Sequence, residues 1–276
     1  MVVFPNAKVN IGLNIVQRRP DGYHNLESIF YPISIYDRLQ VDVAPGTSYN
    51  NCSLTLDGIK IEGSLQDNLV VRAYALLADK IQLPAVNVQL QKLIPMGAGL
   101  GGGSSDAAFM LRVLNEMFQL GLSDSQLESF AACLGADCAF FIKNQPVFAT
   151  GIGNEFHYDV SIPSLAGKTL VLVKPDVFVS TRDAYSFITP AAPAHPLTSS
   201  VLCPLKQWKD LIVNDFEASV FPKFPLIGEV KEQLYQHGAI YASMSGSGSS
   251  VYGIFDAPLL GLDGLFPGMF TMQNTL

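Results

Sequence analysis

The stretch Pro95-Met96-Gly97-Ala98-Gly99-Leu100-Gly101-Gly102-Gly103-Ser104-Ser105-Asp106 places five glycines within seven residues. Ser104, Ser105 or Asp106 is expected to cap the first turn of a following helix. Glycine lets a ligand approach the backbone closely, and the free N–H groups of a helix N-terminus attract anions. The stretch therefore predicts a phosphate-binding loop rather than a simple turn. The helix itself is indicated by apolar residues at helical spacing, namely Ala107, Met110, Leu111, Leu114, Met117 and Phe118.

Two other kinds of phosphate loop can be tested against the flanking sequence. Residues 97–102 match the dinucleotide fingerprint, which requires a buried parallel strand before it and an acidic residue about 20 residues beyond. Residues 86–91 instead alternate apolar and polar side chains, as in a half-exposed, usually antiparallel strand. The acidic candidate Asp124 lies at an expected helix start, where Ser123 and Gln126 form a capping box. No Lys-Ser or Lys-Thr pair follows the glycines, so a P-loop is excluded and a dinucleotide-binding oxidoreductase is disfavoured.

The composition indicates a folded chain without a general nucleic-acid surface. Of the 276 residues, 49% are hydrophobic and 15% are charged, which suits one large domain or two ordinary ones. The net charge of −7 argues against nucleic acid as a partner. We expect no membrane association and a cytoplasmic location, since neither a membrane span nor a signal peptide is evident. Reduced thiols are expected for the four cysteines, which are Cys52, Cys133, Cys138 and Cys203.

An alternating segment near the N-terminus predicts a strand with one polar face. Over residues 8–16, the side chains of Lys8, Asn10, Gly12 and Asn14 point away from the apolar ones. A lysine and two asparagines on one face suggest a polar cavity. For a single strand, however, a solvated outer face is the commoner outcome, and the sequence leaves both interpretations open.

Further elements follow from turn and capping signals. Asp57-Gly58 between two short apolar runs predicts a β-hairpin over residues 53–61. One helix is expected from Gln66 to about residue 80, and another from Ser123 to a C-terminal glycine at Gly135. Residues 245–250 form a serine-glycine loop between two expected strands, and no strong terminal helix is evident around Phe270.

The glycine-rich stretch resembles the ATP loop of the GHMP kinases, which include galactokinase, homoserine kinase, mevalonate kinase and phosphomevalonate kinase. The resemblance rests on the order Pro-Met-Gly-x-Gly-Leu-Gly-Gly-Gly-Ser-Ser-Asp-Ala-Ala over residues 95–108. It narrows to the members that phosphorylate cytidine diphosphate methylerythritol, because residues 5–10 read Pro-Asn-Ala-Lys-Val-Asn and residues 19–26 read Arg-Pro-Asp-Gly-Tyr-His-Asn-Leu. Asn-Asp-Phe-Glu at residues 214–217 also resembles a turn of that family.

The resemblance implies an α+β fold with the two-domain GHMP kinase architecture. A ribosomal-protein-S5-domain-2-like N-terminal domain would cover residues 1–155, and a ferredoxin-like C-terminal domain would cover residues 156–276, with the active site in the cleft between them. The implied reaction is the ATP- and Mg²⁺-dependent phosphorylation of the 2-hydroxyl of the small-molecule substrate, in the non-mevalonate isoprenoid pathway. A monomer or weak homodimer is expected.

The resemblance also implies roles for individual residues. Asp137 would be the catalytic base and Lys8 would stabilise charge; Ala139 stands where the family has proline. From the residues alone, Asp137 lies in an apolar context that calls for a partner or a function, and a turn residue is the alternative. Without the resemblance, His24 would be a loop histidine without a task. Asn68 can serve as a helix cap, which is compatible with a role beside adenine. The implied ATP-binding residues are Pro95, Gly97, Gly99, Leu100, Gly101, Gly102, Gly103, Ser104, Ser105, Asn68, Ser247 and Gly248, of which Ser104 and Ser105 would also contact Mg²⁺. The implied substrate-binding residues are Asn10, Tyr23, His24, Thr181 and Tyr185, with cytosine between the two tyrosines.

Three alternatives to this function remain at the level of sequence. Another GHMP kinase, such as homoserine or mevalonate kinase, would not need the aromatic residues Tyr23 and Tyr185 for its small substrate. A dinucleotide-binding oxidoreductase fails the tests above. A catalytically inactive nucleotide-binding protein is disfavoured because Lys8 and Asp137 are both present.

Overall fold

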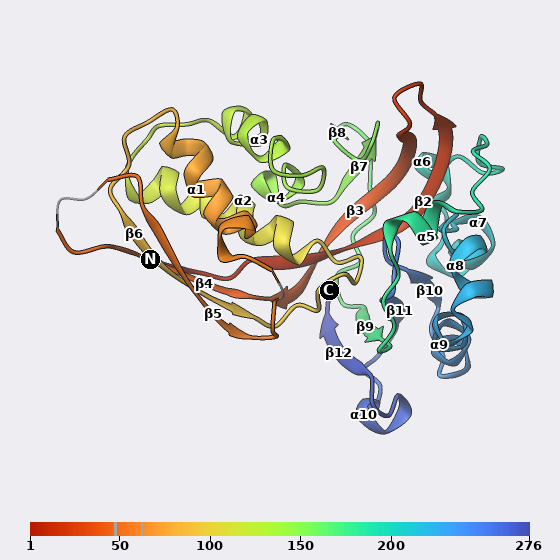
Figure 1. Cartoon of the computed structure of the whole chain (residues 1–276). Helices are drawn as coiled ribbons and strands as arrows, with labels where there is room; N and C mark the ends of the chain where they lie inside the picture. Colours follow the sequence, from red (N-terminus) through yellow and green to blue (C-terminus); the bar gives the residue numbers. More distant parts are fainter. Residues whose placement is uncertain (47–48, 62) are drawn as a thin grey trace. The chain divides into compact units, whose positions relative to one another are not determined.

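The computed structural model describes residues 1–46, 49–61 and 63–276, and the chain divides into two compact units (Figure 1). Unit 1 consists of Met1–Ala7, Ile35–Met96 and Gly101–Gln145. Unit 2 consists of Lys8–Ser34, Gly97–Leu100 and Pro146–Leu276. The units therefore interleave along the chain. The expected domains, residues 1–155 and 156–276, are each one continuous segment, unlike these units. That division stays a prediction.

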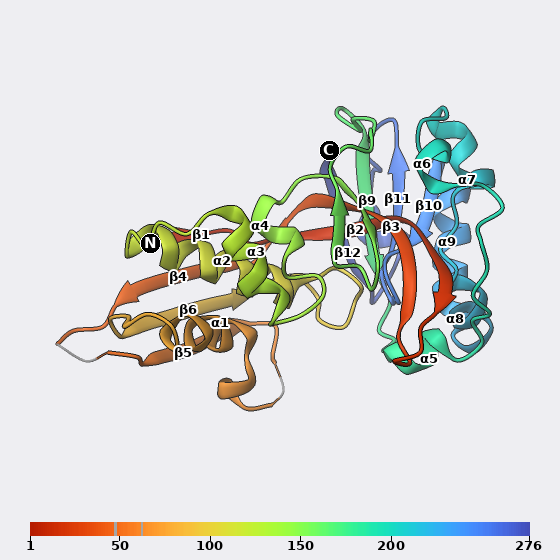
Figure 2. The ribbon, with the colours of Figure 1, turned by 90° about the horizontal axis from the view of Figure 1, so that it is seen from above.

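Unit 1 is a four-stranded sheet with helices packed on it. Its strand order is β1-β4-β6-β5, in which β4 pairs antiparallel and β5 pairs parallel with β6. Figures 1 and 2 show the helices of this unit gathered over one face of the sheet. The elements are β1 (Val2–Val3), β4 (Arg38–Val43), β5 (Cys52–Gly58), β6 (Val86–Lys92), a short 3₁₀ helix (Leu65–Asp67), α1 (Leu69–Ala78), α2 (Gly102–Met117), α3 (Asp124–Ala132) and α4 (Phe140–Lys143).

Side-chain periodicity explains the core of unit 1. The alternation predicted from the sequence for β6 is confirmed, since every second side chain from Val86 onward is buried. The helical spacing after the glycines is also confirmed, because α2 buries one apolar stripe. The residues of that stripe include Ala107, Met110, Leu111 and Leu114, each of which is fully buried.

The predicted hairpin at Asp57-Gly58 is wrong. Strand β5 continues through Gly58 and pairs parallel with β6, and residues 59–61 form no strand. The glycine is required for another reason. Gly58 has φ +79°, and a Cβ atom there would lie 2.2 Å from the backbone oxygen of Lys92. The amide of Ile59 donates a hydrogen bond to that same oxygen at 2.8 Å. Gly58 is therefore required by the close approach of two backbone segments, which in the sequence looks the same as a glycine in a hairpin turn.

Two helix caps were predicted correctly, although the helix expected from Gln66 begins only at Leu69. Asn68 caps α1 through a hydrogen bond from the amide of Val70 to its side chain, and Ser123 and Gln126 form the expected capping box of α3. The expected left-handed glycine at Gly135 is wrong, because α3 ends at Ala132. The amides of Leu134 and Gly135 instead donate to the carbonyl of Ala131, which closes the helix without a left-handed residue.

Unit 2 contains a four-stranded antiparallel sheet in the order β10-β11-β9-β12. Helices α8 and α9 lie along this sheet in Figures 1 and 2. Its core includes side chains from β9 to β11, from α8 and α9, and Leu13 and Ile15 from β2. The elements are β9 (Thr169–Lys174), α5 (Thr181–Tyr185), α6 (Leu197–Ser200), a 3₁₀ helix (Leu205–Gln207), α7 (Trp208–Leu211), α8 (Glu217–Lys223), α9 (Pro225–Gln236), β10 (Tyr241–Met244), β11 (Val251–Phe255), α10 (Leu262–Leu265) and β12 (Phe270–Thr275).

A further sheet in the order β2-β3-β7-β8 contributes mainly to unit 2. Its strands are β2 (Asn6–Arg18), β3 (His24–Tyr36), β7 (Val147–Thr150) and β8 (Glu155–His157). The described residues include no helix with the length and apolar character needed to cross a membrane.

The substitution Gly58→Ala tests the close approach of β5 to Lys92. We expect it to lower the free energy of unfolding by roughly 3 kcal/mol, because it adds a backbone clash to left-handed strain. Gly121→Ala is the matched control, since Gly121 has φ +70° but no atom within 4 Å of the added Cβ. The control should lose only about 1 kcal/mol. Denaturant unfolding of both variants measures the difference, and equal losses would contradict the contact.

Candidate active site

Two glycine loops contact each other in unit 2. A Cβ atom on Gly99 would lie 1.9 Å from the backbone oxygen of Ser245, so only glycine fits there. The Ser245 hydroxyl donates to the Gly99 carbonyl at 2.8 Å, and the amide of Ser250 donates to the carbonyl of Ala98 at 3.3 Å. Residues 245–250 connect β10 to β11 as the predicted hairpin loop. The second loop thus supports the first, and both Ser247 and Gly248 belong to it.

The N-terminus of α2 is free of side-chain caps. The helix begins at Gly102, and its N-cap is Gly101 with φ +69° and no side-chain hydrogen bond. The expectation that Ser104, Ser105 or Asp106 caps the helix is therefore wrong, because a left-handed glycine starts the helix before them. The first-turn N–H groups are not used by a cap, which is the arrangement that binds anions such as phosphate. Pro95, Leu100 and Gly103 flank or belong to this segment.

The polar face of the first long strand is buried, so the solvated-face alternative is excluded. Lys8 and Asn10 on β2 are 3% and 2% exposed. The Lys8 ammonium donates to Asn10 Oδ1 at 2.6 Å and lies 4.9 Å from the centre of the Phe30 ring. The Lys8 amide donates to the Leu100 carbonyl at 2.9 Å, which joins β2 to the glycine-rich stretch within unit 2.

Asn10 is held on every side by hydrogen bonds. Its Nδ2 donates to Ser28 Oγ at 2.9 Å, its amide donates to Ser245 Oγ at 3.3 Å, and its carbonyl accepts from the Tyr252 hydroxyl at 2.8 Å. The Ser28 hydroxyl donates onward to the carbonyl of Gly12 at 2.6 Å. This network fixes Asn10 Oδ1 toward the Lys8 ammonium. Sequence reasoning missed Ser28 and Tyr252, which carry no local signal because their partners are distant in sequence.

The Asn-Asp-Phe-Glu turn anchors the second glycine loop. The Asn214 side-chain amide donates to the carbonyls of Met244 and Gly246, both at 2.8 Å. Asp215 accepts from the amide of Ile15 on β2 at 2.7 Å, and burial raises its pKa. Glu217 accepts from the amide of Met244 at 2.9 Å. The turn therefore connects β2 to the loop, a role that its sequence alone did not reveal.

Asp137 lies in unit 1, in the turn between α3 and α4, and is half-buried. Burial raises the pKa of the neighbouring Cys138 thiol to about 11, opposed by a hydrogen bond from the Ser104 side chain. That hydrogen bond brings the turn that carries Asp137 against the first turn of α2. Ala139 stands where the resemblance leads us to expect proline, and its own φ is −63°. Proline would impose nearly the same φ, so the alanine keeps the backbone angle that proline fixes at this position.

A cavity of about 230 Å³ lies in unit 1 beside Asn68 and Gly103. The Asn68 side chain accepts from the amide of Val70 at 2.9 Å, so its capping role is confirmed. Apolar side chains form much of the lining, as in sites for a flat organic ring. They are Leu56, Ile61, Leu65, Leu69 and Met96.

Of the residues expected to bind cytosine, His24 and Tyr185 contact each other in unit 2. His24 stacks on Tyr185 with ring centres 4.8 Å apart and an interplanar angle of 21°, and Tyr185 meets Phe216 edge-on. Burial, followed by the charge of Arg18, lowers the pKa of His24, which favours a neutral ring at pH 7. Tyr23 is 62% exposed, and Thr181 is the first residue of α5.

Of the two serines in the first turns of α2, Ser104 is partly exposed, whereas Ser105 is fully buried and faces the protein interior. Ser105 Oγ is buried, and no hydrogen-bond partner for it exists among the described residues. The described part of the chain holds no group of three or more His, Cys, Asp or Glu side chains that could bind a metal alone. Mg²⁺ in kinases takes few protein ligands and binds substrate phosphates and water, so a site with the partly exposed Ser104 hydroxyl as its protein ligand is compatible with it.

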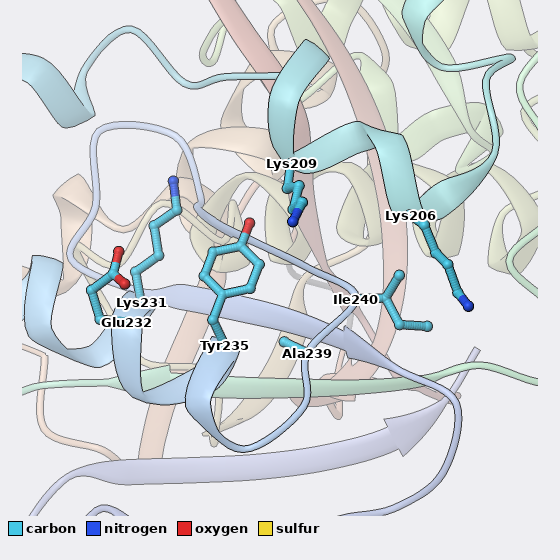
Figure 3. Close-up of a pocket in the computed structure, with 7 residues that line it drawn as sticks. All are labelled: Lys206, Lys209, Lys231, Glu232, Tyr235, Ala239 and Ile240. Carbon is cyan, nitrogen blue, oxygen red and sulfur yellow. The ribbon is translucent and has the colours of Figure 1, made fainter.

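A second cavity, of about 720 Å³, includes none of the residues named above (Figure 3). Lys231 and Tyr235 project from α9, while Lys206 and Lys209 come from the 3₁₀ helix and α7. Lys231 is paired with Glu217 at 2.6 Å, and the Tyr235 hydroxyl is hydrogen-bonded to the backbone of Ala242. These partners explain both side chains as structural.

Comparison with known proteins agrees with this geometry. The family model described as "GHMP kinases N terminal domain" matches residues 68–151, and "GHMP kinases C terminal" matches residues 204–259. A Bacteroides fragilis protein named 4-diphosphocytidyl-2-C-methyl-D-erythritol kinase is 58% identical over 255 residues, which are 92% of this chain and 92% of the relative. A Bacteroides thetaiotaomicron protein of the same name is 55% identical over 257 residues, covering 93% of this chain and 92% of the relative.

Solved structures give the same result at the level of the fold. The crystal structure of a 4-(cytidine 5′-diphospho)-2C-methyl-D-erythritol kinase has a TM-score of 0.83 at 30% identity and covers 99% of this chain and 98% of its own. The homoserine kinase of Cytophaga hutchinsonii has a TM-score of 0.66 at 17% identity, with 98% and 94% covered, and shares the fold alone. The expected α+β, two-domain GHMP kinase fold is confirmed. The chain belongs to the GHMP kinases and, within them, to the family of 4-diphosphocytidyl-2-C-methyl-D-erythritol kinases.

Proposed function

We propose that this protein transfers the γ-phosphoryl group of ATP to the 2-hydroxyl of 4-(cytidine 5′-diphospho)-2-C-methyl-D-erythritol, a step of the non-mevalonate isoprenoid pathway. The observation that carries the proposal is the 58% identity to a kinase named for this substrate over 92% of both chains. The contact between the two glycine loops supports it, since these loops are where the family resemblance places ATP.

ATP would bind with its phosphates along residues 97–105 and at the N-terminus of α2. The uncapped N–H groups of the helix supply the positive potential that a triphosphate requires. The adenine ring would occupy the cavity beside Asn68 and Met96, whose lining is largely apolar. Residues of the second loop, Ser247 and Gly248, would lie beside the phosphates. When bound, Mg²⁺ would neutralise phosphate charge, held on the protein side by the hydroxyl of Ser104.

Catalysis would depend on positioning and charge, as phosphoryl transfer generally does. Asp137 would accept the proton from the substrate 2-hydroxyl as that oxygen attacks phosphorus. Lys8, oriented by Asn10, would stabilise the negative charge on the transferring group. The network around Asn10 keeps this ammonium in one direction before substrate arrives, which lowers the cost of reorganisation.

The cytidine end of the substrate would bind at Tyr23, His24 and Tyr185, with Thr181 and Asn10 contacting other parts of the molecule. A neutral His24 ring has one donor and one acceptor nitrogen, which suits the polar edge of cytosine. Aromatic stacking supplies affinity and hydrogen bonds supply the choice of base.

The direct test is a coupled assay for ADP with ATP, Mg²⁺ and the cytidine substrate, followed by phosphorus NMR of the product. We expect ADP formation and one new phosphate monoester at the 2-position. Homoserine and mevalonate serve as competing acceptors. Preferred phosphorylation of either, or no ADP with any acceptor, would contradict the proposal.

The variant Asp137→Asn tests the assignment of the base. Asparagine preserves size and most hydrogen bonding but cannot accept the proton, so we expect kcat to fall about 10²- to 10⁴-fold with little change in KM. Asp124→Asn is the control, an exposed carboxylate at the start of α3. Steady-state kinetics measure both variants. An Asp137→Asn enzyme with most of the parent kcat would remove Asp137 from the mechanism.

The variant Tyr185→Ala tests the cytosine site. Loss of one stacked aromatic ring should raise KM for the cytidine substrate roughly 5- to 150-fold while KM for ATP stays nearly constant. Phe187→Ala, at a 77% exposed aromatic residue two positions later, should change neither constant. If the substitution at Tyr185 raised KM for ATP instead, the two nucleotide ends would be assigned the wrong way round.

A further inference from the structure

Three charged side chains, Asp37, Lys92 and Asp106, are buried together in unit 1. Lys92 and Asp106 also line the cavity in which we place the adenine ring, and none of the three has a role in phosphoryl transfer. Asp37, Lys92 and Asp106 are 0%, 1% and 2% exposed. The Lys92 ammonium is hydrogen-bonded to Asp37 Oδ2 and, at 2.7 Å, to Asp106 Oδ2. Buried charges are costly unless they are paired, so such a cluster requires a structural or functional explanation.

Asp37 holds the chain immediately before the glycine-rich segment. Its Oδ1 atom accepts hydrogen bonds from the amides of Leu93 at 2.6 Å and Ile94 at 2.8 Å. These residues directly precede Pro95. Two backbone amides bound to one carboxylate fix the direction in which the chain enters the segment.

Lys92 holds the chain immediately after the same segment. A Cβ atom on Gly102, the first residue of α2, would lie 3.4 Å from the Lys92 Nζ and 2.9 Å from Ile94 Cγ2. The ammonium therefore lies directly beneath the start of the helix, and Asp106, in the second turn, accepts from it. The residues on either side of the glycine-rich segment, Ile94 before it and Gly102 at its end, therefore both lie next to the Lys92 side chain.

The cluster holds two carboxyl groups and one ammonium, so Asp106 can be substituted without leaving Lys92 unpaired. Two carboxylates face one ammonium. Burial raises the pKa of Asp106 to about 7, with Lys92 opposing the rise and Asp37 adding to it. No donor among the described residues reaches Asp106 Oδ1. Removal of Asp106 would leave Lys92 and Asp37 as a neutral pair, whereas removal of Lys92 would leave two buried carboxylates without a cation.

We propose that Lys92, bound between Asp37 and Asp106, is a positioning group that fixes both ends of the glycine-rich segment and thereby sets the affinity for ATP. The proposal rests on the proposed function, namely the binding of ATP at this segment. Lys92 acts through the backbone of the loop, because the ordered loop presents its N–H groups in one arrangement before the nucleotide arrives. The sequence signal for it is a lysine in the buried register of β6, after Val86, Val88 and Leu90.

The experiment compares Asp106→Ala with Asp106→Asn. Alanine cuts the link from Lys92 to α2, so we expect the Kd and the KM for ATP to rise at least about tenfold, the loss typical of one hydrogen bond to a charged group. Asparagine keeps an acceptor toward Lys92 and should restore both constants to within about threefold. The kcat at saturating ATP and the KM for the cytidine substrate should not change. If Asp106→Ala does not fold, Asp106→Ser, whose shorter side chain does not reach Lys92, replaces it.

Leu114→Ala is the matched control, a fully buried residue farther along α2 that lies outside the cluster. It should lower the melting temperature without changing the Kd for ATP. If the parent protein binds ATP and Asp106→Ala binds it with the same Kd, the role of the cluster is overturned while the proposed function stands. A parent protein that binds no ATP in calorimetry would contradict the proposed function itself. If the Kd for ATP rose equally in Leu114→Ala, the effect of Asp106→Ala would reflect a general loss of stability, and the positioning role of the cluster would be contradicted.

Discussion

The closest backbone contact in the candidate site is that between Gly99 and the carbonyl of Ser245, and the arrangement of unit 2 around it depends on glycine at position 99. No side chain fits between the two loops, because a Cβ atom would lie 1.9 Å from the oxygen. The contact aligns Ser245 so that its hydroxyl donates to Gly99 and accepts from the amide of Asn10. Asn10 in turn directs the Lys8 ammonium. One steric constraint therefore orders the glycine-rich segment, the loop that supports it and the Lys8 ammonium on β2.

Much of this arrangement could be predicted from local sequence. The cluster of glycines predicted an anion site because left-handed backbone and an open helix start are properties of a few consecutive residues. The polar side of β2 was predicted from simple alternation, although the sequence alone did not decide whether that side is buried. The capping box at Ser123 and the cap at Asn68 were also predicted correctly, since each depends on residues within one turn.

The features that were missed depend on residues far apart in sequence. Gly58 reads as a turn, but its conformation serves a contact with Lys92, 34 positions later. The last strand, β12, pairs with β9 along its whole length, yet its alternation is weak because it is a half-buried edge strand. Asp37, Lys92 and Asp106 meet only in the folded chain. A lysine in a buried register was the one available signal, and it indicates a partner without naming it.

Calorimetric titration with ATP of Gly99→Ala against Gly97→Ala tests whether the contact between the two loops builds the nucleotide site. Both glycines have positive φ, +75° and +58°, so both substitutions strain the backbone. The added methyl group at position 97 meets only the side chain of Phe178, which is 72% exposed and free to move aside. At position 99 it meets backbone. We predict that a folded Gly99→Ala variant binds ATP at least about tenfold more weakly than Gly97→Ala. Equal ATP affinity in the two variants would contradict the claim that the contact between the loops builds the nucleotide site.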